Sequence, residues 1–214
     1  MGLRNWYEAH VVPRLIRCAC GSEVIMERRA QVVPLASGRV FEIGCGGGLN
    51  QRFYDPAQVT AFAGIDPGAK LLDYARAEAT RKGWPESIGA DIREGVGEDI
   101  PFAASSFDTA VCTFTLCSVA DPARVLAELR RILVPGGRLL FLEHGRSPDA
   151  GVAKWQDRIE PLWKPLVGGC HLTRPIGGSI ARAGFDVAPL GAGYAPKMPR
   201  FAAWMEWGVA TAPG

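Results

Sequence analysis

Short apolar runs alternate with amphipathic stretches along most of this chain. The apolar runs predict buried β-strands and lie at residues 39–43, 60–66, 87–94, 107–114 and 138–144. The amphipathic stretches between them have the spacing of helices with one buried face and lie at residues 68–82 and 121–133. Strands that alternate with helices in this way are typical of βαβ units joined into a mainly parallel sheet. The pattern therefore predicts an α/β, Rossmann-like doubly wound fold.

The two ends of the chain show other patterns. Two helical stretches are expected before the first strand, at residues 4–17 and 22–33. Residues 150–183 have the pattern of two further helical pieces. Two late strands, near residues 184–190 and 200–209, are expected to close the sheet as a hairpin. The result would be a seven-stranded sheet with an antiparallel edge strand.

The chain is expected to form a single domain, because no internal repeat or disordered linker interrupts it. Three parts are predicted within it. Residues 1–36 would form a helical lid, residues 37–145 the ligand-binding core, and residues 146–214 the substrate-side helices and last strands. Within the lid, Pro13 is expected to kink or restart the first helix, because proline removes a backbone donor.

The composition excludes several classes of protein. The chain has 214 residues, of which 48% are hydrophobic and 21% charged, a globular mix that disordered and fibrous proteins do not have. No apolar run reaches the ~18 residues of a membrane span, and the first residues lack the pattern of a signal peptide. The formal net charge is +2 and the basic residues are dispersed, so no nucleic-acid partner is expected. An acidic middle part between basic ends is compatible with a cationic ligand or with chance.

The cysteines indicate a reducing compartment. Six of them are spread over the chain, whereas a secreted disulfide framework is small and dense in cysteine. Reduced thiols and a cytoplasmic location are therefore predicted. Cys18 and Cys20 form a close pair, but the three histidines offer no partner pair at ligand spacing. No metal site is expected.

A glycine-rich loop follows the first predicted strand. The glycines alternate at Gly44, Gly46 and Gly48, which lets a backbone approach a ligand closely near a sheet edge. A dinucleotide fingerprint would need a third glycine where Leu49 stands. The acidic Glu42 before the loop would repel a pyrophosphate and suits an ammonium group. At the end of the second strand, an aspartate suits the two hydroxyls of a ribose.

These features resemble the class I S-adenosylmethionine-dependent methyltransferases. The motifs that carry the resemblance are residues 40–48, 64–66, 97–102, 105–108 and 129–137, within a similar region over 38–145. The resemblance implies S-adenosylmethionine as cofactor and S-adenosylhomocysteine as product. It also implies that Gly44 to Gly48 hold the methionine part, Asp66 the ribose and Gly97–Glu98 the edge of the adenine. Val96 departs from the pattern, since many relatives carry Asp or Asn there.

The resemblance and the strand ends together give a set of expected cofactor-binding residues. The set is Glu42, Gly44, Cys45, Gly46, Gly48, Asn50, Asp66, Pro67, Gly97, Glu98, Thr113, Phe114 and Leu116. A non-catalytic nucleoside-binding module, or a reductase that uses a dinucleotide, is the alternative from another class of protein.

A narrower resemblance concerns the methyl acceptor. Residues 111–119, 142–144, 163–164 and 168–174 are similar to the thiol S-methyltransferase group and its bacterial relatives. That resemblance implies sulfur as the methyl acceptor. Four tryptophans suggest a small, apolar acceptor, although helix-spaced tryptophans are usually core residues: Trp155, Trp163, Trp204 and Trp207. Phospholipid (phosphatidylethanolamine) N-methyltransferases and quinone-ring methyltransferases are the alternatives. The membrane-associating N-terminal segment of the animal members is not expected here, peripheral membrane contact stays open, and so does the oligomeric state.

Two histidines are candidates for activating a thiol. Only a few per cent of a thiol with a pKa near ~8.5 is thiolate at neutral pH, so a base or a positive neighbour would help. His144 is expected at the end of the fifth strand, on the cofactor side, and is the first candidate. His171, with Arg174 beside it, is the second. A hydrogen-bonded structural histidine is the alternative at both positions.

Overall fold

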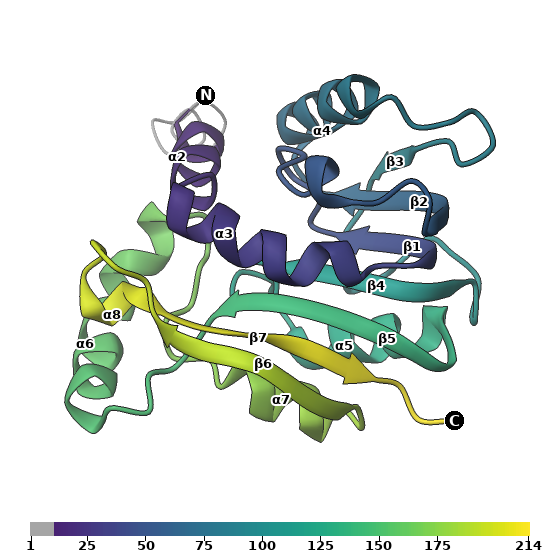
Figure 1. Ribbon diagram of the computed structural model, residues 1–214. Coiled ribbons are helices and arrows are strands. Elements are labelled where there is room, and N and C mark those ends of the chain that lie inside the picture. Colours follow the sequence, from purple (N-terminus) through teal and green to yellow (C-terminus); the bar gives the residue numbers. More distant parts are fainter. Residues whose placement is uncertain (1–10) are drawn as a thin grey trace.

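A computed structural model describes residues 11–214 and contains one seven-stranded sheet (Figure 1). Its strands are β1 Gly38–Ile43, β2 Val59–Asp66, β3 Asp91–Glu94, β4 Phe107–Thr113, β5 Leu133–His144, β6 Asp186–Tyr194 and β7 Trp204–Thr211. They lie in the order β3-β2-β1-β4-β5-β7-β6. The first five of this order pair in parallel, and β7 pairs antiparallel with both β5 and β6. The predicted Rossmann-like sheet is confirmed.

Helices cover both faces of the sheet (Figure 1). They are α2 Val12–Cys20, α3 Glu23–Val32, α4 Ala69–Lys82, α5 Pro122–Ile132, α6 Ala150–Leu166, α7 Ile176–Arg182 and α8 Arg200–Ala203. Side chains of α3 and α4 pack with one face of the strands, and side chains of α5 and α7 pack with the other. The helix α6 lies beside α8, beyond the ends of β6 and β7.

The pleat of the strands explains why their sequences are apolar without interruption. In β1, Val40 points into the layer that contains Ile25 of α3, while Phe41 points into the layer that contains Leu129 of α5. Successive side chains of a strand point to opposite faces, so a strand covered on both sides needs apolar residues at every position. Val40 and Phe41 are both fully buried.

The ends of the chain differ in detail from the sequence prediction. The antiparallel strand β7 lies between β5 and β6, so the edge itself is β6. Residues 200–203, predicted as strand, form the short helix α8 before β7 begins. Pro13 stands in the first turn of α2, where proline is tolerated because the first amides of a helix have no intrahelical partner to lose.

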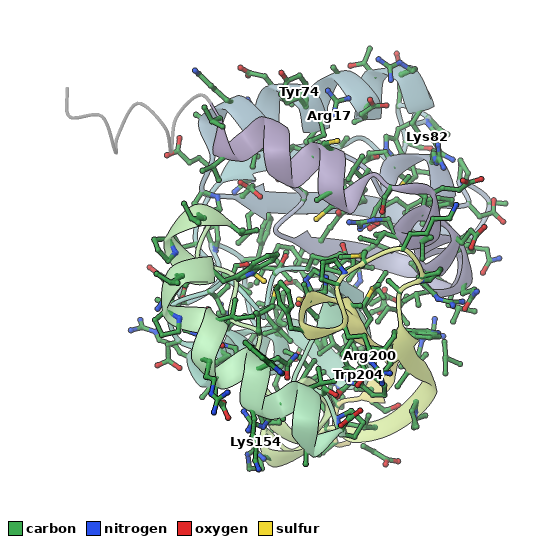
Figure 2. All side chains as sticks on the ribbon, turned by 90° about the vertical axis from the view of Figure 1, so that its left-hand side faces the viewer. Arg17, Tyr74, Lys82, Lys154, Arg200 and Trp204 are labelled. Carbon is green, nitrogen blue, oxygen red and sulfur yellow. The ribbon has the colours of Figure 1, made fainter. Side chains whose placement is uncertain are left out.

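The predicted N-terminal lid divides into two unlike parts. The helix α3 buries Ile25 and Val32 against the sheet, so it belongs to the core. The helix α2 instead supplies Arg17 and Cys20 to the cavity lining at the ends of the strands, and Figure 2 shows Arg17 of α2 next to Tyr74 of α4. The Arg17 guanidinium lies 4.4 Å from the centre of the Tyr74 ring and forms a 3.3 Å ion pair with Glu78. Residues 1–10 of the predicted lid lie outside the described part.

The order of the strands fixes where a ligand can bind. The chain runs outward from β1 to β3 and then returns to place β4 on the other side of β1. The loops after β1 and β4 therefore leave in opposite directions and open a crevice at their carboxyl ends. In the described part of the chain, no helix has the length and apolar character needed to cross a bilayer.

Candidate functional site

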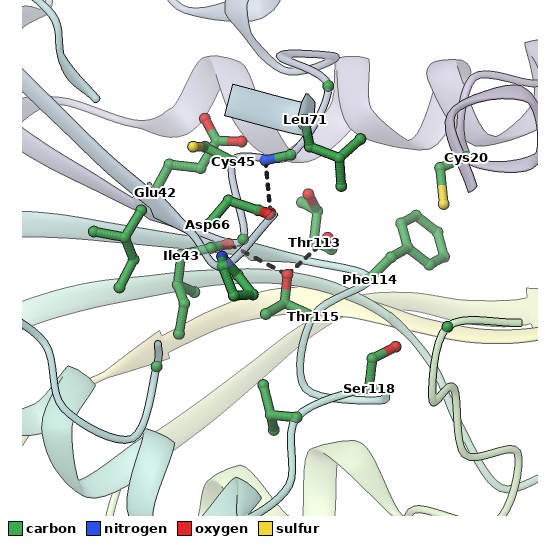
Figure 3. Close-up of a pocket in the computed structure, with 18 of the residues that line it drawn as sticks. Cys20, Glu42, Ile43, Cys45, Asp66, Leu71, Thr113, Phe114, Thr115 and Ser118 are labelled. Atoms are coloured by element: carbon green, nitrogen blue, oxygen red, sulfur yellow. Dashed lines mark hydrogen bonds between the residues drawn. The ribbon is translucent and has the colours of Figure 1, made fainter. Parts of the chain in front are cut away.

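A cavity of about 420 Å³ lies in this crevice (Figure 3). Ten of the thirteen residues expected at a cofactor site line it: Glu42, Gly44, Cys45, Gly46, Asp66, Pro67, Gly97, Glu98, Thr113 and Phe114. Gly48, Asn50 and Leu116 do not line it. The loops after four different strands thus converge where the sequence pattern placed them.

The glycine loop after β1 is fixed by close backbone contacts. Gly44 has a φ of +63°, and a Cβ atom there would overlap the hydroxyl of Thr115, so only glycine fits. The Gly46 amide donates a hydrogen bond to Asp66 Oδ2 at 3.0 Å, and the Gly68 amide donates to Oδ1 at 2.8 Å. Asp66 is 7% exposed, and burial raises its pKa while the two amides act to lower it. Its carboxylate is held at the wall of the cavity with lone pairs left for a ligand.

Gly48 serves the packing of a helix. A Cβ atom at this position would lie 2.8 Å from Glu78 Cβ and 3.0 Å from Ala75 Cα, and its φ of +71° belongs to the left-handed region. The loop can therefore rest directly on α4 only because no side chain is present. Gly48 shapes the site from outside the cavity.

A buried polar network lies beneath the loop. Glu42 accepts hydrogen bonds from Asn50 Nδ2 at 2.9 Å and from the Tyr54 hydroxyl at 2.8 Å. Arg29 of α3 donates through Nη1 to Asn50 Oδ1 at 2.6 Å and to Thr113 Oγ1 at 2.7 Å. Burial raises the pKa of Glu42 to about 7, against the effect of its hydrogen-bond donors and of Arg29. Both Glu42 oxygens thus have protein partners, and an ammonium group would have to share them.

Arg29 is a residue that the sequence reasoning did not identify. It is 4% exposed, lines the cavity together with Arg17, and its Nε atom has no hydrogen-bond partner within residues 11–214. A buried guanidinium with an unpartnered N–H favours an anionic group nearby. The signal that could have identified Arg29 is its helical spacing from Ile25 and Val32, which places a basic residue on the buried side of α3.

The carboxylate of Glu98 connects two loops. Its Oε1 atom accepts hydrogen bonds from the amides of Ala120 and Asp121, at 3.0 and 3.1 Å, at the start of α5. The preceding Gly97 lies so close to Ile43 that a Cβ atom would come within 2.6 Å of its Cδ1. Val96 is 48% exposed at the rim. At the position expected for the adenine edge, the backbone of Gly97 therefore packs closely on Ile43. The Glu98 carboxylate there already accepts two hydrogen bonds from the protein.

Glu143 holds the loop after β4, and the sequence reasoning missed it too. Its carboxylate accepts hydrogen bonds from the amides of Thr115, Leu116 and Cys117, at 2.8, 3.0 and 3.1 Å. Leu116 is thereby fixed in the core rather than in the cavity. Burial raises the pKa of Glu143, and the three amides oppose this shift. An acidic residue within an apolar strand is the signal that points to such a role.

Phe114 lies at the start of this loop and lines the cavity together with Thr115, Ser118 and Val119. Its backbone adopts a φ of +55°, a conformation that side chains rarely adopt and that is concentrated at functional sites. The ring meets the His144 ring edge-on at 4.9 Å, and the Arg29 guanidinium lies 5.3 Å from its centre. Figure 3 shows Phe114 facing Cys20 of α2.

The two candidate histidines have different surroundings. His171 is bonded to Glu160, with 2.8 Å between Nδ1 and Oε1, and its amide donates to the carbonyl of Cys117 at 2.7 Å. His144 lies behind Phe114, with its Nδ1 3.8 Å from Cys170 Sγ. Its Nε2 atom is buried and has no hydrogen-bond partner in the described part of the chain.

Three metal-ligating side chains meet behind Phe114. The Sγ atoms of Cys117 and Cys170 and a ring nitrogen of His144 all lie within 4.8 Å of one another. The pKa of Cys170 is lowered to about 5, chiefly by its hydrogen bond with Cys117. The sequence pattern singles out only Cys18 and Cys20 as a candidate metal-binding pair and does not indicate this cluster. The reason is topological, since the three residues come from loops or strand ends far apart in the sequence.

Comparison with known proteins gives consistent matches. A family described as "Methyltransferase domain" matches residues 41–141. The thiol S-methyltransferase TMT1B of Rattus norvegicus is 40% identical over 157 residues, which cover 71% of this chain but 61% of that protein. The phosphatidylethanolamine N-methyltransferase of Cereibacter sphaeroides is 32% identical over 142 residues, 65% of this chain and 68% of that protein.

A solved structure shares the whole fold. It is an S-adenosylmethionine-dependent methyltransferase from Thermotoga maritima, described as a possible histamine N-methyltransferase. The TM-score is 0.66 at 21% sequence identity, and the alignment covers 99% of this chain and 100% of that one.

Proposed function

Because this chain belongs to the class I S-adenosylmethionine-dependent methyltransferases, we propose that it methylates the sulfur of a small, apolar thiol. S-adenosylmethionine supplies an electrophilic methyl group on its sulfonium, and S-adenosylhomocysteine is the product. The protein's own contribution is to bind the two reactants, align them and keep water out. A cytoplasmic location stays a prediction from the free thiols.

The residues of the cavity fit this cofactor. Asp66 keeps lone pairs for ribose hydroxyls, and the close passage at Gly97 suits a flat ring against the backbone. Arg29 and Arg17 are the cations that would hold the carboxylate of the methionine part, and the unpartnered Nε of Arg29 supports this role. Both arginines come from the N-terminal helices, outside the region that the family matches.

The observation that carries the thiol assignment is the state of the carboxylates that line the cavity. In the described part of the chain these are Glu42, Asp66 and Glu98. Each already accepts two hydrogen bonds from the protein. Near Phe114 the cavity has the Arg29 guanidinium, 5.3 Å from the centre of the Phe114 ring, and otherwise uncharged lining residues: Cys20, Ser118, Val119 and Gly168. A cationic amine would lack a carboxylate partner at that end, whereas a neutral thiol needs none.

A lipid amine is the second candidate, and one observation favours it. On α6, Trp155 is 58% exposed and Leu162 is 72% exposed, with Lys154 and Arg158 nearby on the same helix. Exposed apolar side chains beside basic ones suit contact with a membrane surface. The similarity to a phosphatidylethanolamine N-methyltransferase also points in this direction.

An acceptor screen with methyl-labelled S-adenosylmethionine tests the proposal. The acceptors are short alkyl thiols, phosphatidylethanolamine vesicles and a hydroxylated quinone, and Asp66→Ala serves as the control with impaired cofactor binding. We expect label in the thioether and none in the lipid or the quinone. Label in the lipid amine alone would establish the second candidate instead. Binding of S-adenosylmethionine without transfer to any acceptor would favour a non-catalytic binding module, and preference for NAD(H) a reductase.

A further inference from the structure

The cluster of Cys117, His144 and Cys170 has the dimensions of a metal site. Zinc binds sulfur at about 2.3 Å and imidazole nitrogen at about 2.0–2.1 Å, so tetrahedral ligand atoms lie about 3.6–3.8 Å apart. His144 Nδ1 and Cys170 Sγ are 3.8 Å apart, and all three ligand atoms lie within 4.8 Å. The side chains therefore need little movement to share one ion.

The cluster is held in place by contacts from the surrounding backbone. The Glu143 carboxylate accepts a hydrogen bond from the amide of Cys117. Because Glu143 immediately precedes His144 in β5, the same bond ties the loop of Cys117 to the strand end that carries His144. The His171 amide, which follows Cys170, donates to the carbonyl of Cys117 at 2.7 Å. Arg174 donates to the carbonyls of the same loop, at Leu116 and Val119. A metal site requires such support, because ligands left loose bind weakly.

The cluster lies next to the cavity, although none of its three ligands lines it. Ser118, next to Cys117, and Gly168, two residues before Cys170, both line it, and the Phe114 ring lies against His144. Cys117 and Cys170 are buried, so neither thiol is a surface group that would bind ions at random. These observations place the three ligands behind the Phe114 side chain, next to the end of the cavity where the methyl acceptor is proposed to bind.

We propose that Cys117, His144 and Cys170 bind Zn²⁺ and leave its fourth coordination position to the acceptor thiol. Three protein ligands with one open position are the arrangement of catalytic zinc sites, and two thiolates with one imidazole are among the known sets. Soft thiolate ligands select zinc over Mg²⁺ and Ca²⁺, which require oxygen. This assignment replaces the general-base role predicted for His144.

The role in the reaction rests on the proposed thiol acceptor. The thiol binds the metal through sulfur and releases its proton to water, because a thiol that coordinates zinc is deprotonated. The bound thiolate sulfur attacks the methyl carbon and forms a new carbon–sulfur bond. The bond from that carbon to the sulfonium breaks, and its electron pair stays on the departing sulfur. The product is a neutral thioether, which holds zinc less strongly than a thiolate and so leaves the site.

Metal binding is testable without cofactor or acceptor. The metal-stripped protein is titrated with Co²⁺ and Zn²⁺, and we expect one ion per chain with a thiolate-to-cobalt charge-transfer band. Cys117→Ser and Cys170→Ser should each lower the metal affinity at least tenfold, because losing even a residue that supports a ligand typically lowers it about 10- to 100-fold. Cys18→Ser, which removes an exposed thiol, is the matched control and should change nothing. Binding that survives in both buried variants, or disappears with Cys18, overturns the proposal.

A measurement on the unaltered protein covers the case in which these variants fail to fold. X-ray absorption at the zinc edge should show two sulfur scatterers at about 2.3 Å and one imidazole nitrogen at about 2.0 Å. Nitrogen and oxygen scatterers alone would refute the site. Thiol methylation that stays at full rate after the metal is removed would refute its role in activation and leave the proposed function standing. Zinc on this donor set without methylation of any thiol would refute the proposed function and leave the site.

Discussion

Replacing Glu42 by glutamine tests the electrostatics of the buried network beneath the glycine loop. The amide has nearly the shape of the carboxylate but does not titrate. Burial raises the pKa of Glu42 from 4.5 to about 7, so the folded protein keeps a proton between these values that the unfolded chain has released. The free energy of unfolding therefore falls as the pH rises through this window. At about 1.4 kcal/mol for each pKa unit, the loss is about 3 kcal/mol.

Urea unfolding followed by circular dichroism measures this loss. The unaltered protein and Glu42→Gln are compared between about pH 4.5 and about pH 7.5. The difference between the two unfolding free energies isolates Glu42, because the other buried carboxylates are present in both proteins. We expect the unaltered protein to lose about 3 kcal/mol relative to the variant across this range. The exposed Glu86→Gln is the control. Parallel curves for the two proteins would refute the reasoning.

Three further predictions concern other parts of the site. Asp66→Ala should lower S-adenosylmethionine affinity about 100-fold or more in calorimetry, the value of two hydrogen bonds to a charged group, with the fold retained; unchanged affinity would contradict the ribose assignment. Glu143→Gln should lower the free energy of urea unfolding by about 2–4 kcal/mol, because the NH₂ of the new side chain would face backbone N–H donors. An unchanged unfolding midpoint would contradict the role of Glu143 in holding the loop after β4. Gly97→Ala should cost about 1–3 kcal/mol through its contact with Ile43 Cδ1, and Ile43→Val should relieve it; additive losses in the double variant would disprove that contact.

Local sequence patterns were enough to predict the fold and the position of the cavity. The run of residues 39–43 leads straight into the glycines, and Asp66 ends the next strand. In a parallel sheet the carboxyl ends of neighbouring strands share one edge, so these two features had to meet. The glycine pattern is also local, because a positive φ and a close approach depend on one residue and its near neighbours.

The parts that the sequence did not predict depend on contacts between distant segments. Arg29 bonds to Asn50 and Thr113 only because α3 packs across the middle of the sheet. Cys117 and Cys170 approach each other only because the loop after α6 returns to the end of β4. No periodicity in the chain encodes such meetings. The place of β7 within the sheet is of the same kind, since the hairpin pattern fits either order of the last two strands.

The contact between α3 and the glycine loop makes α3 part of the same folding unit as the cavity. The family match begins at residue 41, and a boundary placed there would separate Arg29 from its two partners. It would also expose the surface of the sheet that Ile25 and Val32 now cover, and remove the buried Arg29 guanidinium that acts on the carboxylate of Glu42. The autonomous folding unit therefore extends at least to the start of α3. A sequence profile drawn around the motifs alone therefore gives too short a boundary for this fold.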